Sequence, residues 1–135
     1  MRNRIILKLF IGLFIVFIVS GCDPESDNKI YLNENDNGRT IEISKNDTLI
    51  ITLESNPTTG YRWNFANLDG NFLFQDGDSI YTQDPECGAM DGCGGTEQMT
   101  FQTNQTGNGA IRLEYKRGNE TTPDAREFNI TIIVK

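Results

Sequence analysis

Hydrophobic and polar residues alternate along most of the chain after residue 28. The alternation has a period of two in six segments, which are Thr40–Ile43, Leu49–Leu53, Tyr61–Phe65, Met99–Phe101, Ile111–Tyr115 and Phe128–Val134. Such a period is typical of a β-strand with one buried face, and clusters of Gly, Asn, Asp and Pro between the segments indicate turns. No segment keeps a helical period. The pattern predicts an all-β domain, a two-sheet β-sandwich of about seven strands, with a core that includes Trp63, Phe101 and Phe128.

The first 21 residues carry a different pattern. Three basic residues lie within Met1–Lys8, an apolar run follows over Leu9–Val19, and small residues precede Cys22 in the string Val19-Ser-Gly-Cys22. A basic start, a short apolar stretch and small residues are typical of a secretory signal peptide. The apolar run is shorter than the about 20 residues that a membrane-spanning helix needs.

The end of this segment resembles a bacterial lipobox, in which the cysteine is acylated and becomes the mature N-terminus. On this interpretation residues 1–21 are the signal peptide, residues 22–28 are the lipidated Cys22 with a short tether, and residues 29–135 are the folded domain. Two or more acyl chains anchor a protein stably, so we expect a lipid-anchored protein of the cell envelope, periplasmic or at the cell surface. A plain signal peptide and an N-terminal anchor helix remain the alternatives.

Composition limits the classes of function. The 135 residues fit one domain, and the absence of histidine excludes a Ser-His-Asp or Cys-His catalytic unit and any histidine-ligated metal site. The 12 basic and 19 acidic residues leave a net charge of -7, which argues against a nucleic-acid partner because phosphates need a basic face. We therefore expect a binding protein that is not an enzyme, holds no cofactor or metal and acts as a monomer.

Two cysteines, Cys87 and Cys93, lie six positions apart in a glycine-rich segment. Export would permit a disulfide between them. Closing so short a ring is worth roughly 2 kcal/mol in the chain-entropy model, so its main effect would be to fix the shape of the loop. Two free thiols are the alternative.

The first of three candidate loops is Asn56-Pro-Thr-Thr-Gly60, between two predicted strands. Pro57 fixes its own φ and makes Asn56 extended, while Gly60 permits a positive φ. We expect a stiff, uncharged, protruding loop with the hydroxyls of Thr58 and Thr59 free at its tip.

The other two loops span Asp84–Gly95 and Lys116–Ala125. The former contains four glycines that permit close backbone approach to a partner. In a sandwich of the expected strand order the three loops gather at one end, where exposed loops on a rigid scaffold commonly bind ligands.

Several strings in these loops resemble one family. They are Asn56-Pro-Thr-Thr-Gly-Tyr61 with Trp63, then Gly92-x-Gly-Gly95, then Leu113-x-Tyr115. In this order they are similar to the chagasin-type inhibitors of papain-like cysteine proteases, and the resemblance covers Ile41–Val134. It implies an immunoglobulin-like β-sandwich whose three loops form a wedge that enters the active-site cleft of a papain-family cysteine protease.

The resemblance also implies the contacts. The first loop would cover the catalytic Cys-His pair of the protease, and the other two would hold the sides of the cleft, partly through main-chain contacts. The protease-binding residues would be Asn56, Pro57, Thr58, Thr59, Gly60, Tyr61, Gly92, Gly94, Gly95, Arg117, Gly118 and Asn119.

The third loop departs from the family pattern, which commonly has Arg-Pro-Trp after the tyrosine. Here Arg117 is retained, but Gly118 and Asn119 replace the proline and tryptophan. A buried interface Trp is often worth about 2 kcal/mol, so its loss would weaken binding on the order of 30-fold unless Tyr61, Tyr81 or Arg117 compensates.

Two further interpretations stay open from the sequence. One is an envelope-anchored β-sandwich that binds a non-protease ligand, such as a glycan, a peptide or an envelope partner. The other is a structural envelope lipoprotein whose loops are only turns. Fold alone does not separate these from an inhibitor.

Overall fold

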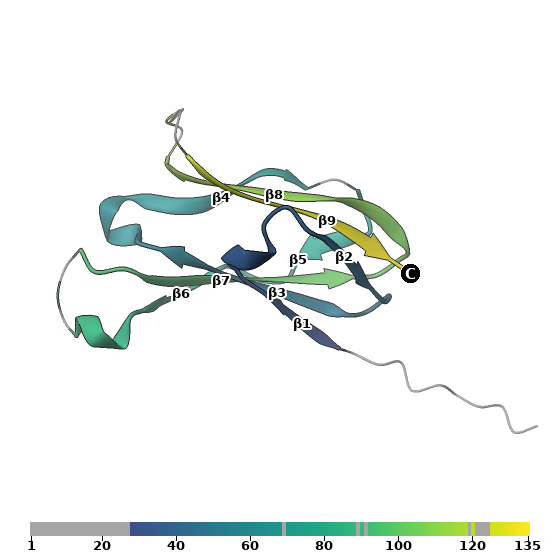
Figure 1. Ribbon diagram of the computed structural model, residues 1–135, viewed down its shortest axis with the longest axis horizontal. Coiled ribbons are helices and arrows are strands. Elements are labelled where there is room, and N and C mark those ends of the chain that lie inside the picture. Colours follow the sequence, from purple (N-terminus) through teal and green to yellow (C-terminus); the bar gives the residue numbers. More distant parts are fainter. Residues whose placement is uncertain (1–27, 69, 89, 91, 119, 121–124) are drawn as a thin grey trace, which may run out of the picture.

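The computed structural model describes residues 28–68, 70–88, 90, 92–118, 120 and 125–135, so the expected signal peptide and Cys22 lie outside it. The described residues form nine β-strands and three 3-10 turns (Figure 1). The strands are β1 Lys29–Leu32, β2 Thr40–Ile43, β3 Thr48–Ser55, β4 Tyr61–Leu68, β5 Leu73–Gln75, β6 Ile80–Gln83, β7 Gly95–Thr103, β8 Gly107–Arg117 and β9 Arg126–Val134. The turns are η1 Glu34–Asp36, η2 Pro57–Thr59 and η3 Pro85–Cys87.

The strands build two sheets that pack face to face, as an immunoglobulin-like sandwich does. In the first sheet the order is β1-β3-β7, with β5 and β6 both paired to β7, and in the second it is β2-β9-β8-β4. The β1–β3 and β2–β9 pairs are parallel and the other pairs are antiparallel. The predicted all-β sandwich is confirmed.

Alternate side chains of the central strands fill the space between the sheets. Trp63, Phe101 and Phe128 are all buried, so the predicted core stripe is confirmed. The side chains with less than 2 % exposure are Phe101, Phe128, Leu49, Ile51, Leu53, Met99, Ile111, Leu113, Ile130 and Ile132. Their burial fixes the register of each central strand, because a slip of one residue would turn this set toward solvent.

The described residues form more strands than the predicted seven, because β1, β5 and β6 are short and carry apolar side chains on both faces. These are edge strands of three or four residues. Ile80 of β6 is 62 % exposed and Phe74 of β5 is 41 % exposed, since both face solvent beside the long strand β7. Leu32 of β1 and Leu73 of β5 are buried next to the exposed Tyr31 and Phe74, so apolar residues on both faces hide the period of two in the sequence.

The predicted gathering of three loops at one end is confirmed. Ser55 at the end of β3 pairs with Gly95 at the start of β7, and Tyr61 at the start of β4 pairs with Arg117 at the end of β8. Figure 1 shows η2, η3, the end of β8 and the start of β9 at one end of the sandwich, with the start of β1 and the C-terminus at the other. Within the described part of the chain, no helix is long and apolar enough to cross a membrane.

Candidate functional site

The first loop closes as a short 3-10 turn. The Thr59 N–H donates to the Asn56 carbonyl at 3.2 Å, and the Gly60 N–H donates to the Pro57 carbonyl at 3.0 Å. Gly60 has a φ of 84°, which confirms the predicted positive φ, and Asn56 lies at φ −139° and ψ 79°. Thr58, Thr59 and Gly60 are exposed. The loop is therefore a locked turn that presents its tip to solvent.

The two threonine hydroxyls are not free, so that part of the prediction is wrong. Thr58 Oγ1 donates to Asn56 Oδ1 at 2.6 Å, and Thr59 Oγ1 donates to the Asn56 carbonyl at 2.6 Å. A hydroxyl has one proton to donate, so only the acceptor capacity of both oxygens remains for a partner. The Asn56 side chain orders the loop because such short polar groups bond nearby backbone and side chains in turns.

Aromatic side chains support the base of this loop. The Asn56 N–H donates to the Tyr115 hydroxyl at 2.6 Å. The Tyr115 ring centroid lies 5.6 Å from that of Tyr61 and 5.2 Å from that of Trp63. The Trp63 Nε1–H also donates to the Glu54 carbonyl at 3.0 Å. The string Leu113-x-Tyr115 thus supports the first loop from the neighbouring strand.

Two arginines flank the third loop, and they bond to the first loop and to the strand that precedes it. Arg117 donates to the Thr59 carbonyl from Nε at 3.1 Å and from Nη2 at 2.5 Å, and its guanidinium lies 5.3 Å from the Tyr61 ring centroid. Arg126 donates from Nη2 to the Glu54 carbonyl at 2.6 Å. Its guanidinium lies 4.6 Å from the Tyr115 ring centroid, within cation–π range.

Sequence analysis did not single out Arg126. It lies two residues before the alternating segment Phe128–Val134, and its partners come from β3, β4 and β8. These strands belong to two different sheets, and they surround the Arg126 guanidinium only because the sheets pack together.

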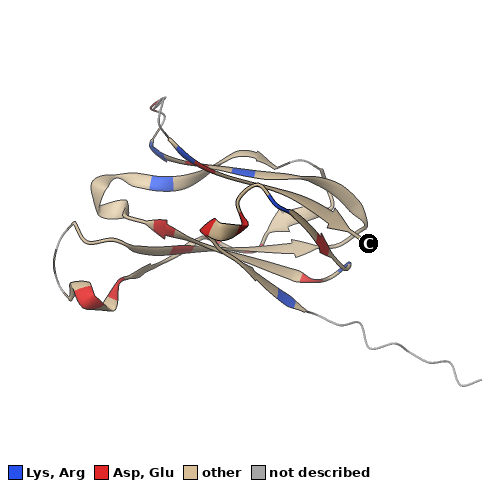
Figure 2. Ribbon diagram, viewed as in Figure 1, with Lys and Arg blue, Asp and Glu red and all other residues tan. Residues whose placement is uncertain are grey.

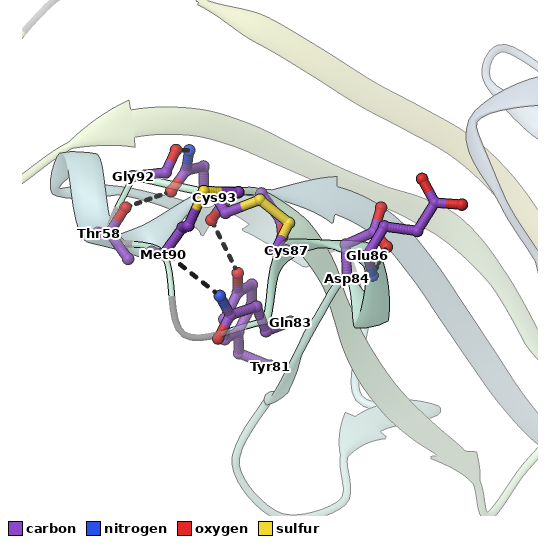
Figure 3. The surroundings of a disulfide bond; sticks show 11 residues. Thr58, Tyr81, Gln83, Asp84, Glu86, Cys87, Met90, Gly92 and Cys93 are labelled. Carbon is purple, nitrogen blue, oxygen red and sulfur yellow. Dashed lines mark hydrogen bonds between the residues drawn. A yellow bond between two sulfur atoms is a disulfide. The ribbon is translucent and has the colours of Figure 1, made fainter.

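The second loop is closed by a disulfide between Cys87 and Cys93, whose Cα atoms lie 5.9 Å apart, so the predicted pairing is confirmed. Figure 3 shows side chains of β6 reaching this loop. The Tyr81 hydroxyl donates to the Cys93 carbonyl at 3.3 Å, and Gln83 Nε2 donates to the Met90 carbonyl at 3.3 Å. The loop is therefore tied both across its own ring and to the sheet.

The first and second loops are joined directly. Asn56 Nδ2 donates to the Gly92 carbonyl at 2.8 Å. A cleft of about 770 Å³ lies beside this contact, and its lining includes Asn56, Thr59, Cys87, Cys93, Tyr115 and Arg126. The three loops therefore form one connected surface, because the first loop bonds to each of the other two.

The glycines of the second loop differ in whether backbone conformation or close packing requires them. Gly92 has a φ of 83°. A Cβ on Gly95 would lie 2.2 Å from the Thr82 carbonyl oxygen, whereas one on Gly94 would lie 3.7 Å from the Ser55 carbonyl oxygen. Gly95 is therefore required by close packing against β6 within the domain, before any partner binds.

The third loop cannot follow the family pattern at residue 118. Gly118 has a φ of 50°, and proline is fixed near about −65°. Asn119 lies outside the described residues. The backbone at this point therefore differs from one built around proline.

Asp84 and Glu86 are the described carboxylates of the second loop, and both belong to a capped turn. Figure 2 shows acidic residues at η3. Asp84 Oδ1 accepts the Glu86 N–H at 3.0 Å, so it caps the turn. In the part of the chain that the structure describes, no group of three or more His, Cys, Asp or Glu residues is arranged to hold a metal ion.

The fold and these loops define a binding protein, a rigid sandwich that presents one connected surface at its end. Residues 42–132 match the model of the chagasin family of peptidase inhibitors, described as family I42. The chain therefore belongs to the chagasin family. As a member it is a protease inhibitor and not an enzyme.

Individual relatives agree with this assignment. Amoebiasin-1 of Entamoeba histolytica is 33% identical over 104 residues, which cover 77% of this chain and 98% of the relative. Chagasin of Trypanosoma cruzi is 32% identical over 85 residues, covering 60% and 74% of the two chains. The crystal structure of a cysteine protease inhibitor from Entamoeba histolytica matches in fold with a TM-score of 0.70, at 24% identity, over 80% of this chain and 96% of that one.

Proposed function

We propose that this protein inhibits papain-like cysteine proteases by inserting the connected loop surface into the active-site cleft. The observation that carries this proposal is the first loop, which neighbouring elements hold at Asn56 and at Thr59. Arg117 and Tyr115 bond it from β8, and Gly92 bonds it from the second loop. A loop ordered before binding avoids most of the entropic cost of association.

Each loop has a distinct role in the proposal. Thr58, Thr59 and Gly60 cover the catalytic Cys-His pair of the protease, and the 3-10 turn keeps this backbone from lying extended across the cleft as a scissile segment. Gly92 and Gly94 lie along one wall of the cleft, and Arg117, Gly118 and Asn119 lie along the other. Tyr61 and Gly95 act mainly from within, by supporting the loops.

We further propose that Cys22 carries lipid and anchors the protein in the cell envelope, where it binds its protease one to one. The support is the string Val19-Ser-Gly-Cys22 after a basic and apolar segment. The disulfide agrees with an exported protein, because such bonds persist in oxidising compartments.

A titration of the domain from Ser26 onward against papain in a fluorogenic assay tests the inhibitor proposal. Thr58→Arg should abolish inhibition, because a long cation on the tip of η2 cannot fit where the loop meets the catalytic pair. The matched control is Thr131→Arg, since Thr131 is also exposed but lies on β9, away from the loops. Thr131→Arg should inhibit as the wild type does.

Equal inhibition by the Thr58→Arg and wild-type proteins would contradict the loop mechanism. If the folded wild-type protein failed to inhibit papain and a cathepsin L-like enzyme at high micromolar concentration, the proposal would fail for that class of target. A pull-down from the source organism's secreted proteins would then identify the ligand.

A further inference from the structure

A charged side chain lies buried directly beneath the loop surface. Glu97 is only 2 % exposed and follows the inward register of β7, in line with Met99 and Phe101. Sequence analysis did not single it out, although its two-residue spacing from Met99 placed it on the buried face. A carboxyl group in such a position is costly unless it is hydrogen-bonded.

Three donors satisfy this carboxyl group. Oε2 accepts the Ser55 hydroxyl at 2.9 Å and the Trp63 N–H at 3.5 Å, and Oε1 accepts the Ser79 hydroxyl at 2.7 Å. Ser55 is the last residue of β3, immediately before Asn56. Trp63 is the third residue of β4, just after the loop. One oxygen atom is thus shared by the strand that enters the first loop and the strand that leaves it.

These two strands belong to different sheets. β3 pairs with β7 in the first sheet, while β4 pairs with β8 in the second. No backbone ladder joins β3 to β4, so their separation at the loop base depends on side chains. Glu97 spans the gap from β7, where it pairs in register with Leu53 on one side and Tyr81 on the other.

We infer that Glu97 is a positioning residue for the first loop, setting the distance between the two ends of Asn56–Gly60 before a protease is met. This inference rests on the proposed inhibitory function. Glu97 does not touch the protease itself. It acts through Ser55 and Trp63, and its loss lets the loop sample conformations that must be reordered on binding.

Four variants separate positioning from general packing. Glu97→Leu keeps an apolar side chain of similar size but leaves Ser55 and Trp63 without their acceptor. Glu97→Gln retains an acceptor oxygen for Ser55 and Trp63, and its amide can donate to the rotatable Ser79 hydroxyl. Ser55→Ala removes a donor beside the loop, whereas Ser79→Ala removes a donor to the same carboxyl group away from it.

The first readout is the kinetics of papain inhibition. We expect Glu97→Leu to weaken binding by about 10-fold or more, largely through slower formation of the tight complex, and Glu97→Gln to stay within about 3-fold of wild type. Ser55→Ala should weaken binding and Ser79→Ala should not. Unchanged inhibition by Glu97→Leu, or equal losses in the two serine variants, would overturn the inference.

The second readout does not need a protease. Amide hydrogen exchange at Thr59 and Gly60, whose N–H groups close η2, should accelerate in Glu97→Leu and return toward wild type in Glu97→Gln. Faster exchange throughout both sheets, without rescue by Gln, would show a merely structural role. If wild type does not inhibit but the exchange contrast holds, the proposed function fails and the positioning role stands.

Discussion

At the residue scale, Asn56 organises the first loop with all four of its polar atoms. Its N–H donates to Tyr115, its carbonyl accepts from Thr59, and its side-chain amide both accepts from Thr58 and donates to the Gly92 carbonyl. An aspartate would keep the first three contacts but could not donate to Gly92. The string Asn-Pro-Thr-Thr-Gly therefore encodes a turn that is complete in itself and linked to its neighbours.

At this scale we predict that alanine substitutions at two adjacent glycines, Gly94 and Gly95, have different effects on stability. Gly95→Ala should destabilise the domain by about 1–3 kcal/mol, because its Cβ would lie 2.2 Å from the Thr82 carbonyl oxygen and backbone must shift. Gly94→Ala should change stability by no more than about 0.5 kcal/mol, since its Cβ would make an ordinary contact. Urea unfolding of both variants measures the difference. Equal stabilities would contradict the prediction, because they would show that the backbone of β6 moves aside at no cost.

At the element scale, the second and third loops stabilise the first by different means. The second loop is made rigid by a covalent bond and by contacts from β6. The third is flanked by Arg117, which bonds the Thr59 carbonyl of the first loop, and by Arg126, which bonds the Glu54 carbonyl of β3 two residues before that loop. A hydrogen bond that involves a charged group is stronger than a neutral one, so the third loop can position the first without the family's proline.

Removing the disulfide tests the role of the second loop. The double variant Cys87→Ser with Cys93→Ser should lose roughly 2 kcal/mol of unfolding free energy, the chain-entropy value for a ring of this size. It should also inhibit more weakly, because the Gly92 carbonyl that accepts from Asn56 would no longer be held in place. Denaturant titration and papain inhibition of both proteins measure these effects.

A matched control for this variant is the Thr131→Arg protein, which changes an exposed residue outside the loops. A double variant that lost stability but kept full inhibition would show that the second loop orders itself on the protease.

At the scale of the whole molecule, the domain has two functionally different ends. Lys29, where the described domain begins, pairs with Thr48 at the start of β3, and Ser55 at the end of β3 leads into the first loop. Eight residues of strand span about 26 Å. A lipid on Cys22 would therefore hold the end opposite to the loops near the membrane, with the loop surface facing away.

This geometry predicts that anchoring leaves inhibition intact. Lipidated protein in vesicles should inhibit soluble papain with an affinity within about 3-fold of the soluble domain, because β1 begins beside the start of β3, at the end of the sandwich opposite to the loops. Cys22→Ser should move the protein from the membrane fraction to the soluble fraction. A strong loss of inhibition in vesicles would contradict the proposed orientation, and unchanged fractionation of Cys22→Ser would contradict the lipid anchor.

The central strands and the turn at Asn56–Gly60 were predictable because both depend on local chemistry. Alternation marks strands whose one face is buried, and Pro57 with Gly60 restricts the backbone whatever surrounds it. The cysteine pair at Cys87 and Cys93 was visible for the same reason, since six residues bring the two side chains within reach. The short edge strands left little trace in the sequence, because apolar side chains occupy their exposed face as well as their buried face.

The sequence by itself determined the class of fold, the family and the shape of the first loop, all of which rest on short-range patterns. Only the tertiary structure decided how that loop is held. Glu97, Tyr115 and Arg126 are far from Asn56 in the chain, and pairing across two sheets brings them to its base. Burial strengthens the hydrogen bonds of Glu97 and depends on every strand that packs around it, whereas the exposed Arg126 bonds through its charge.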